Sequence, residues 1–331
     1  MRPDITSTGA SSPRPAVEIA VFYAALLLGV VSILASPAIP EGLIRGPLCL
    51  LAAWGMRRER AWSAYGLALL AAVSAGTTMA NGMFGPQQPT SLAAATLKLS
   101  ALVAVGVVVL FFLAGRSIER RVGRRGRAWP WIAASMLIGG FLLLFGLYST
   151  PTGSMENTLL AGDHIAVWRS HGKVPARGEM VVHIYPVNRT DIFVKRVVGL
   201  PGDRVRIRNK QLFVNGAAVA EPYAIHKTEY LDNYRDNFPS EANVPLYPAG
   251  REMLDKHVVN GEVVVPAGRY FVLGDNRDAS LDSRYWGFIE LSDIIGTPKF
   301  VYYSVEQNAE GDVNGSPLLH LRWGRIFHRV S

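Results

Sequence analysis

The sequence predicts a membrane protein in which N-terminal transmembrane α-helices precede a mostly-β domain of antiparallel sheets. Three observations lead to this prediction. The 331-residue chain is 49% hydrophobic with a mean hydropathy of +0.18, residues 128–148 contain no charged side chain, and short runs rich in β-branched residues begin at residue 163. Because a wholly soluble chain rarely averages above zero on this scale, part of this chain is expected to contact lipid.

The clearest predicted span is residues 128–148. At ~1.5 Å per residue, an uncharged helix of this length covers roughly 30 Å of hydrocarbon, and Trp129, Trp131 and Tyr148 near its ends resemble an interfacial aromatic belt. Further spans are predicted at residues 16–39, 61–80 and 91–115. Residues 43–56 are short for a span and could instead be re-entrant or interfacial. The number of spans, four or five, and the side of the N-terminus therefore stay open.

The formal charge is distributed unevenly along the chain. Residues 1–150 carry 13 Lys+Arg against 5 Asp+Glu, whereas residues 151–331 carry 21 of each. A nucleic-acid-binding protein would concentrate its excess positive charge on the folded domain, so this distribution excludes a nucleic-acid partner. With Cys49 as the single cysteine, an intramolecular disulfide and a cysteine-ligated zinc or iron–sulfur site are excluded as well.

Arginine-rich connections set the predicted orientation. Six arginines lie within residues 116–127 and three within residues 57–60, and the positive-inside rule places both connections in the cytoplasm. The chain after Tyr148 then lies on the far side of the membrane. The expected organisation is a multi-span region at 1–127 with three or four helices, a last transmembrane helix at 128–149, and an extracytoplasmic β-rich domain at 150–331.

Short β-branched runs separated by turn residues characterise the second half. The predicted strands are 164–168, 180–185, 192–198, 204–207, 211–214, 270–273 and 300–305. Residues 221–262, rich in Tyr, Asn, Asp and Pro with weak periodicity, are expected to form an extension or insertion loop.

Ser154 is a candidate nucleophile, although a serine in a turn such as 151–155 is usually only a turn or capping residue. A serine hydroxyl needs a base within hydrogen-bond reach. His164 beside Asp163 is one option, but neighbours in a strand point to opposite faces, so Asp163 is poorly placed to orient His164. The other histidines, at positions 171, 183, 226, 257, 320 and 328, lie in no setting that marks them as catalytic.

Lys195 is the better candidate base. It interrupts the apolar run 192–198, whose alternation places Phe193, Lys195 and Val197 on one face. A lysine buried among apolar side chains has a lowered pKa and can accept a proton near physiological pH. The alternative interpretation is an ordinary solvated lysine on a strand.

A third segment, residues 274–287, is dense in charged and polar side chains and follows a predicted strand. One interpretation is a solvated loop with local salt bridges. The two glycines, the Tyr-Trp pair and the number of charges favour instead a rigid, internally bonded loop that supports a site. The residues expected to give this support are Asp275, Arg277, Asp282 and Arg284.

Taken together, these segments resemble type I signal peptidase, the membrane-anchored serine protease that removes signal peptides from exported proteins. Four motifs carry the resemblance in the family's order: PTGSMENTL, GDHIAV, KRVVGLPGD and GDNRDASLDSRYWGF. The resemblance covers the last predicted helix and most of residues 151–305. It implies a signal-peptidase-like β-sheet fold that carries a Ser-Lys dyad, with no metal or organic cofactor.

The resemblance also implies roles for individual residues. Ser154 corresponds to the nucleophile, Lys195 to the general base, and Ser280 to the hydroxyl that holds the lysine amine. The oxyanion hole would combine the Ser154 backbone N–H with the Thr152 hydroxyl, and Met155 would line a shallow pocket for small substrate residues.

Several positions depart from the family pattern. Thr152 stands where Gram-negative members commonly have serine, Asn157 where proline is frequent, and Ala279 where asparagine is frequent; none of these changes removes a catalytic group. Four or five spans instead of one or two is the larger departure, and it leaves the role of residues 1–127 open.

The predicted partners are signal-peptide-bearing preproteins and the lipid bilayer, and the predicted location is the cytoplasmic membrane of a bacterium. Two alternatives remain from the sequence: a pilin-maturing peptidase of conjugative transfer, and a non-enzymatic membrane-anchored β domain. A self-cleaving repressor with the same dyad would need a cytosolic DNA-binding module, and residues 1–150 offer predicted spans in its place.

Overall fold

The computed structural model describes residues 14–34, 42–71, 91–123, 144–170, 172–307 and 320–330, together with five single residues between 130 and 141. These residues divide into two compact units, one within residues 1–143 and one within residues 144–331.

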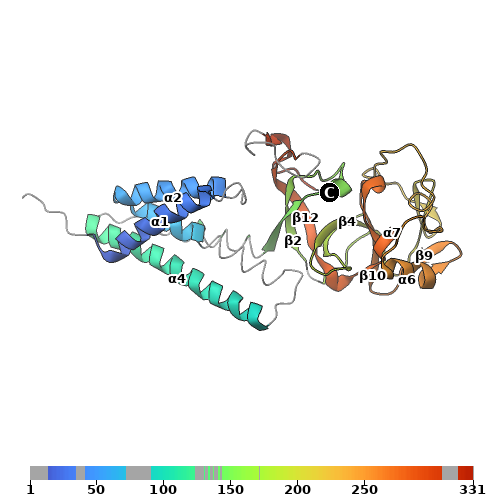
Figure 1. Cartoon of the computed structure of the whole chain (residues 1–331), viewed down its shortest axis with the longest axis horizontal. Coiled ribbons are helices and arrows are strands. Elements are labelled where there is room, and N and C mark those ends of the chain that lie inside the picture. Colours follow the sequence, from blue (N-terminus) through green and yellow to red (C-terminus); the bar gives the residue numbers. More distant parts are fainter. Residues whose placement is uncertain are drawn as a thin grey trace, which may run out of the picture. The chain divides into compact units, whose positions relative to one another are not determined.

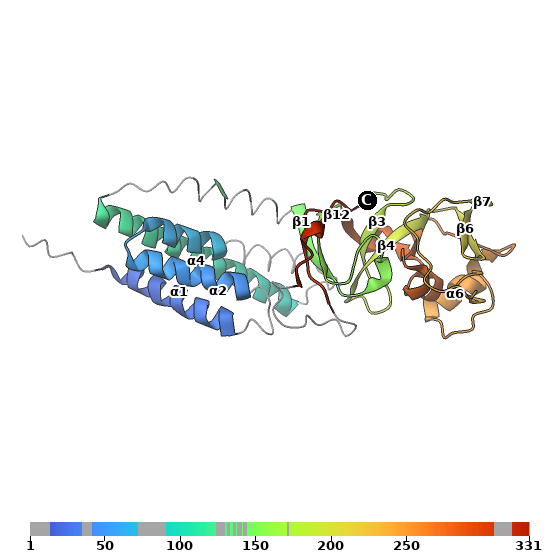
Figure 2. The same ribbon diagram turned by 90° about the horizontal axis from the view of Figure 1, so that it is seen from above.

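The first unit is helical. It contains α1 (Ala16–Leu34), α2 (Gly42–Arg57), a helical stretch at 61–71 and α4 (Ser91–Val122). Both α2 and α4 pack against α1, and the three helices run side by side in Figures 1 and 2. Small side chains allow the helices to approach closely, since Ala25, Ala53 and Ala114 are all buried in the shared core.

Among the described helices, none combines the length and the apolar composition that crossing a bilayer requires. The predicted spans are therefore not confirmed. Residues 35–39, 72–80 and most of 128–144, which belong to three of those spans, lie outside the described residues.

Arg121 forms a partly buried ionic cluster in the helical unit. Its guanidinium donates to Glu18 Oε2 at 2.7 Å and to Glu59 Oε1 at 2.6 Å. These bonds tie α4 to α1 and to the turn that follows α2. One of the basic residues that the sequence assigns to a solvated cytoplasmic loop therefore lies in α4 and has a packing role.

The predicted helix at 128–148 is wrong for residues 145–148, which lie in a strand. Residues Phe145–Thr150 form strand β1, which pairs antiparallel with β2 (Asp163–Arg169), Tyr148 lying opposite Ile165. An uncharged apolar run satisfies a helix and a buried strand equally well, and pairing with a distant strand decides between them. The ring of Phe145 packs edge-on against Trp168 at 5.1 Å between centroids.

The second unit contains two antiparallel sheets, which confirms the predicted mostly-β domain. The seven-stranded sheet has the order β1-β2-β12-β3-β4-β10-β11 and the five-stranded sheet the order β7-β6-β5-β9-β8 (Figure 1). The remaining strands are β3 (Met180–Ile184), β4 (Ile192–Gly199), β5 (Arg204–Arg208), β6 (Gln211–Val214), β7 (Ala217–Ala218), β8 (Val258–Val259), β9 (Glu262–Val264), β10 (Arg269–Leu273), β11 (Ile289–Glu290) and β12 (Ile294–Ser304). Every predicted strand coincides with an observed one.

Part of the predicted extension or insertion at 221–262 packs into the core of the second unit, although many of its residues are exposed. The segment includes α6 (Pro248–His257), and Tyr234, Phe238 and Met253 are buried in the same core as strands β5, β6 and β9. Because these side chains fill that core, the segment is an integral part of the second unit. Its weak periodicity reflects packing by individual aromatic residues, not by one regular face.

Asp163 links three separate parts of the β unit. Its carboxylate is fully buried and accepts hydrogen bonds from the Leu160 N–H at 2.8 Å, from the Ser304 hydroxyl at 2.7 Å and from the Arg325 guanidinium at 2.5 Å. The start of β2, the end of β12 and the segment near the C-terminus are therefore held at one point.

We predict that Asp163→Ala destabilises the β unit by about 3 kcal/mol, because it leaves the Arg325 charge partly buried without its partner. Pulse proteolysis of the full chain across a urea series should show a clearly lower midpoint for this unit. Glu252→Ala, which breaks the exposed Glu252–Lys256 pair, is the control and should leave the midpoint unchanged. Equal midpoints for wild type and Asp163→Ala would contradict this account.

Candidate active site

A single turn of 3₁₀-helix, η1 (Gly153–Met155), presents Ser154 four residues after β1 ends. Two apolar side chains fix this turn from beneath, since Met155 and Leu159 are buried in the core that also contains Ile165. The Ser154 backbone N–H donates to no group in the described part of the chain. The first N–H groups of a helical turn have no partner within it, so this donor is available to a ligand.

Lys195 lies directly beside Ser154. It is carried by β4, which runs between β3 and β10, and its Nζ donates a hydrogen bond to Ser154 Oγ at 2.9 Å. Only 3% of Lys195 is exposed. The predicted alternation is confirmed, because Phe193 and Val197 share one apolar cluster on this face while Val194 packs in another.

Burial controls the charge of Lys195. Loss of solvation lowers its pKa from 10.5 to about 8, although the carboxylate of Asp282 acts in the opposite direction. A substantial fraction of the amine is therefore neutral near physiological pH and can accept a proton. A neutral amine 2.9 Å from a serine hydroxyl is the arrangement that nucleophilic catalysis by serine requires.

Asn276 holds the turn that carries Ser154 through two hydrogen bonds. Its backbone N–H donates to the Ser154 carbonyl at 3.1 Å, and its Nδ2 donates to the Gly153 carbonyl at 3.2 Å. Two bonds to consecutive carbonyls fix both the position and the rotation of η1. The loop at 274–287 therefore supports the site through its backbone as well as its charges.

Three buried ion pairs hold this loop in place. Arg196 binds Asp275 through two hydrogen bonds of 2.8 and 2.7 Å. Arg277 binds Glu221 in the same way at 2.8 and 2.6 Å. Arg284 binds Asp282 at 2.9 Å through both oxygens. Paired guanidinium–carboxylate bonds of this kind fix orientation as well as distance.

Only part of this ion-pair network is predicted from the sequence. The four predicted support residues all form buried ion pairs, but two of their partners, Arg196 and Glu221, lie outside the loop. Arg196 follows Lys195 immediately and points to the other face of β4, so alternation could have marked it as a second buried charge. For Glu221 and Asn276 no signal in the sequence indicated a contact.

The remaining predicted site residues lie near the dyad in different settings. The Thr152 hydroxyl is 3.4 Å from Ser154 Oγ. Ser280 is buried, and its hydroxyl has no hydrogen-bond partner among the residues described; the expected bond to Lys195 is thus not formed in this structure. Met155 is 2% exposed and packs into the core beneath the turn.

The competing pair His164 and Asp163 does not form a relay to Ser154. Asp163 is bound to Ser304 and Arg325, as described above, and the His164 ring packs against Tyr303 at 5.0 Å between centroids. The hydroxyl of Ser154 has Lys195 as its partner. Of the two bases considered, the structure brings only Lys195 to the serine.

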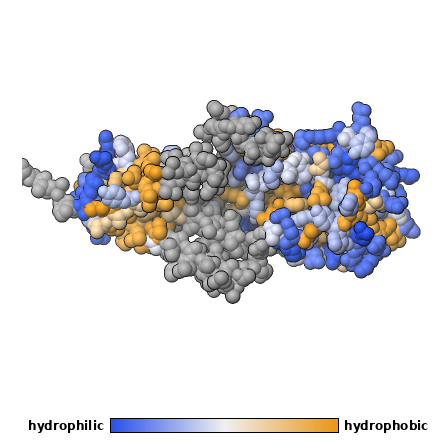
Figure 3. Space-filling view, viewed as in Figure 1, coloured by the Kyte–Doolittle hydropathy of each residue, from blue (hydrophilic) through white to orange (hydrophobic). Residues whose placement is uncertain are grey.

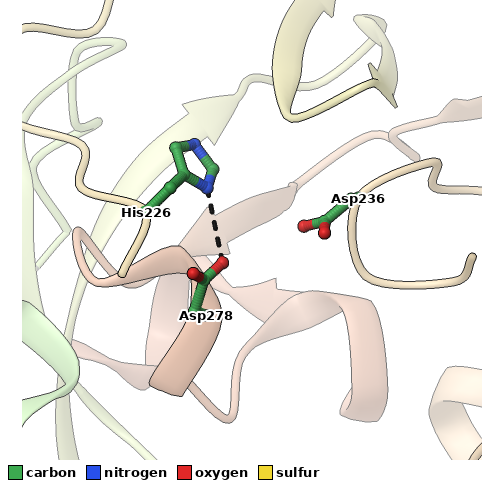
Figure 4. A group of neighbouring side chains, drawn as sticks. All are labelled: His226, Asp236 and Asp278. Carbon is green, nitrogen blue, oxygen red and sulfur yellow. Dashed lines mark hydrogen bonds and ion pairs between the residues drawn. The ribbon is translucent and has the colours of Figure 1, made fainter. Parts of the chain in front are cut away.

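A second polar cluster lies beyond the loop, where His226, Asp236 and Asp278 bring ligand-type atoms within 4.8 Å of one another (Figure 4). Arg235 already donates to both carboxylate oxygens of Asp236 and lies 3.4 Å from Asp278. Lys210 Nζ is 4.0 Å from each carboxylate. With two cations in place, this cluster is an ion-pair network, and we assign no metal to it.

Comparison with known proteins identifies the family of this chain. The family model described as signal peptidase, peptidase S26 matches residues 127–303. This chain belongs to that family, and it is a peptidase of the serine type.

Three relatives illustrate the extent of the match. Signal peptidase I of Bacillus caldolyticus is 35% identical over 188 residues, which cover 56% of this chain and 95% of that protein. Signal peptidase I of Pseudomonas fluorescens is 39% identical over 155 residues, or 42% of this chain and 54% of that protein. Signal peptidase IB of Staphylococcus aureus is 32% identical over 167 residues, covering 50% and 81%.

Because the pKa of Lys195 is about 8, peptidase activity should depend on pH with a defined sign. Only the neutral amine can act as a base, so kcat/KM should rise tenfold per pH unit below pH 8 and level off above it. Steady-state cleavage of a preprotein between pH 6 and 10 tests this expectation. A midpoint near 6.5, the ordinary pKa of histidine, would instead indicate a histidine base.

Proposed function

We propose that Ser154 and Lys195 form the catalytic dyad that removes signal peptides from exported preproteins. The observation that carries this proposal is the 2.9 Å hydrogen bond between Lys195 Nζ and Ser154 Oγ at a site that excludes solvent from the amine. Two of the relatives described above are named signal peptidase I, which supports the substrate class.

In the proposed mechanism, Lys195 takes the hydroxyl proton as Ser154 Oγ attacks the carbonyl carbon before the cut bond. The Ser154 N–H and the Thr152 hydroxyl stabilise the resulting oxyanion. The Lys195 ammonium then gives its proton to the departing amine, which leaves an acyl-serine. Lys195 next accepts a proton from the water that attacks this ester, and the released Ser154 oxygen recovers a proton from the ammonium.

The ion-pair network makes this mechanism possible because it fixes the loop that holds the nucleophile. Asn276 lies between Asp275 and Arg277, both of which are locked by bidentate pairs. Its hydrogen bonds to the turn at 153–154 are therefore anchored on both sides. Ser280 comes from the same loop, and a rotation of its hydroxyl toward the amine is proposed to orient Lys195 during the reaction.

We further propose that the helical unit lies in the bilayer, with the β unit on the extracytoplasmic side. Figure 3 shows hydrophobic residues gathered on the visible face of the helical unit. The large apolar side chains exposed on these helices include Tyr23, Leu27, Leu51, Trp54, Leu110 and Leu113. So much exposed apolar surface is unfavourable in water and favourable in lipid. The arginine-rich segment at 116–127 supports a cytoplasmic position for that end of α4.

The dyad assignment predicts a specific pattern of mutant activities. Ser154→Ala and Lys195→Met should each lower kcat for preprotein cleavage by at least about 10⁴-fold, because members of one catalytic unit fail together. Lys195→Arg should also be inactive, since a guanidinium stays charged at any working pH. His164→Ala should keep most of the activity.

The urea midpoint of Lys195→Met shows whether this variant still folds. Removing a buried ammonium relieves a desolvation cost, so this variant should unfold at a urea midpoint no lower than that of the wild type. An active Lys195→Met enzyme together with an inactive His164→Ala enzyme would reverse the assignment of the base.

The proposed topology predicts the outcome of proteolysis on intact cells. A protease added to spheroplasts should digest residues 150–331, because an extracytoplasmic β unit is accessible without lysis. A cytoplasmic marker protein should stay intact in the same sample. Protection of the β unit until the membrane is permeabilised would overturn this topology.

A further inference from the structure

His183 is a fully buried histidine in the wall of the active site that the dyad does not use. It lies on β3 and has no exposed surface. Its Nδ1 is 2.9 Å from the Ile184 carbonyl oxygen. A carbonyl can only accept, so the ring proton is on Nδ1 and Nε2 carries an unshared electron pair.

The Nε2 atom is an acceptor without a donor. It is buried and makes no hydrogen bond to any group in the described part of the chain. Leaving a buried acceptor unpaired is unfavourable, and such exceptions in folded proteins call for a functional explanation. An apolar ring at this position would avoid the cost entirely, because the neighbouring rings are those of Phe193 and Trp286.

The sheet register places His183 on the same face as the base. In the antiparallel pairing of β3 with β4, Val181 lies opposite Lys195 and His183 lies opposite Phe193. His183 and Lys195 are therefore diagonal neighbours, a separation that long and aromatic side chains can bridge. The Lys195 amine lies 5.4 Å from the centroid of the Phe193 ring, and the His183 ring lies 6.3 Å from it.

We propose that His183 is a positioning residue for Lys195: its unprotonated Nε2 accepts a hydrogen bond, directly or through one water molecule, from the ammonium that Lys195 becomes when it takes the proton of Ser154. This inference rests on the proposed role of Lys195 as the base. The buried Nε2 atom of His183 then has a hydrogen-bond donor only while Lys195 is charged.

The environment of Lys195 must meet two opposing requirements. An apolar environment keeps the amine neutral and ready to accept a proton, but the same environment opposes the charge that proton transfer creates. A neutral acceptor adds no charge to the resting site and stabilises the ammonium when it forms. His183 stays neutral at working pH, because burial, together with the charge of Lys195, lowers its pKa to about 4 against the opposing hydrogen bond to Ile184.

Asp275 faces the site as an ion pair with Arg196. Although burial acts in the opposite direction, the Arg284 guanidinium lowers the pKa of the Asp282 carboxyl, and burial raises the pKa of Tyr185, which follows β3. A transition near pH 8 in the kinetics therefore reports Lys195.

The test is the pH profile of kcat/KM for preprotein cleavage by the full-length enzyme carrying His183→Phe. Because a hydrogen bond to the ammonium favours the charged form, its loss should move the acidic limb down by about one pH unit. The plateau of kcat should fall about tenfold with KM unchanged. His183→Asn, which keeps an acceptor, should restore most of the limb position. Tyr185→Phe, a change at the residue that follows β3 and lies further along the register from Lys195, should leave the limb in place.

An acidic limb that does not move in His183→Phe would overturn the proposal, whether or not activity falls. It would mean that Nε2 serves another donor, such as the indole N–H of Trp286, which also lacks a described partner. If Lys195→Met is active, the dyad assignment fails first. If the acidic limb does not shift in His183→Phe while Lys195→Met is inactive, only the proposed role of His183 is refuted.

A spectroscopic measurement covers the case in which His183→Phe does not fold. In wild-type enzyme labelled with ¹⁵N at its imidazoles, the Nε2 resonance of His183 should move with the midpoint seen in the kinetics, and Lys195→Met should abolish this transition. A wild-type Nε2 resonance that is constant between pH 6 and 10 would refute the proposal.

Discussion

The structure depends most on one constraint: the amine of Lys195 must be desolvated and still touch the Ser154 hydroxyl. Desolvation requires a buried position on a central strand, which β4 provides between β3 and β10. Contact requires that a turn from a distant part of the chain reach that strand, and the bond spans 41 positions in sequence. These two requirements account for the arrangement of the two sheets, the loop at 274–287 and the segment at 221–228.

Buried ion pairs hold the turn that carries Ser154 close to Lys195, although burying these charges costs desolvation free energy. Removing an ion pair from water is unfavourable unless its geometry is good and its other hydrogen bonds are satisfied. Arg196 meets this condition, since it binds Asp275, donates to the Gly178 carbonyl and stacks over the Tyr223 ring at 3.8 Å. Such pairs tolerate no displacement, so they hold the serine within reach of the amine more strictly than apolar packing would.

The strands and the contact between Lys195 and Ser154 could be predicted from the sequence because the signals of the strands and of the two motifs are local. Alternation over residues 192–198 identified a strand and placed Lys195 on its apolar face. The partners of the loop could not be predicted in this way, since Arg277 and Glu221 are 56 positions apart. The strand at 145–148 was missed because an apolar run without charges fits two structures. His183 gave no signal, because only the sheet register shows that it lies diagonal to Lys195.

The most direct test of the account is a titration of Lys195 itself. In the full chain labelled with ¹³C at lysine Cε, the Lys195 resonance, assigned by its absence in Lys195→Met, should titrate near pH 8. Exposed lysines without a carboxylate partner supply the internal reference near the ordinary lysine value of about 10.4. A Lys195 midpoint at or above that reference would mean that the amine is charged in the working enzyme, and it would contradict the claim that burial prepares this lysine to act as a base.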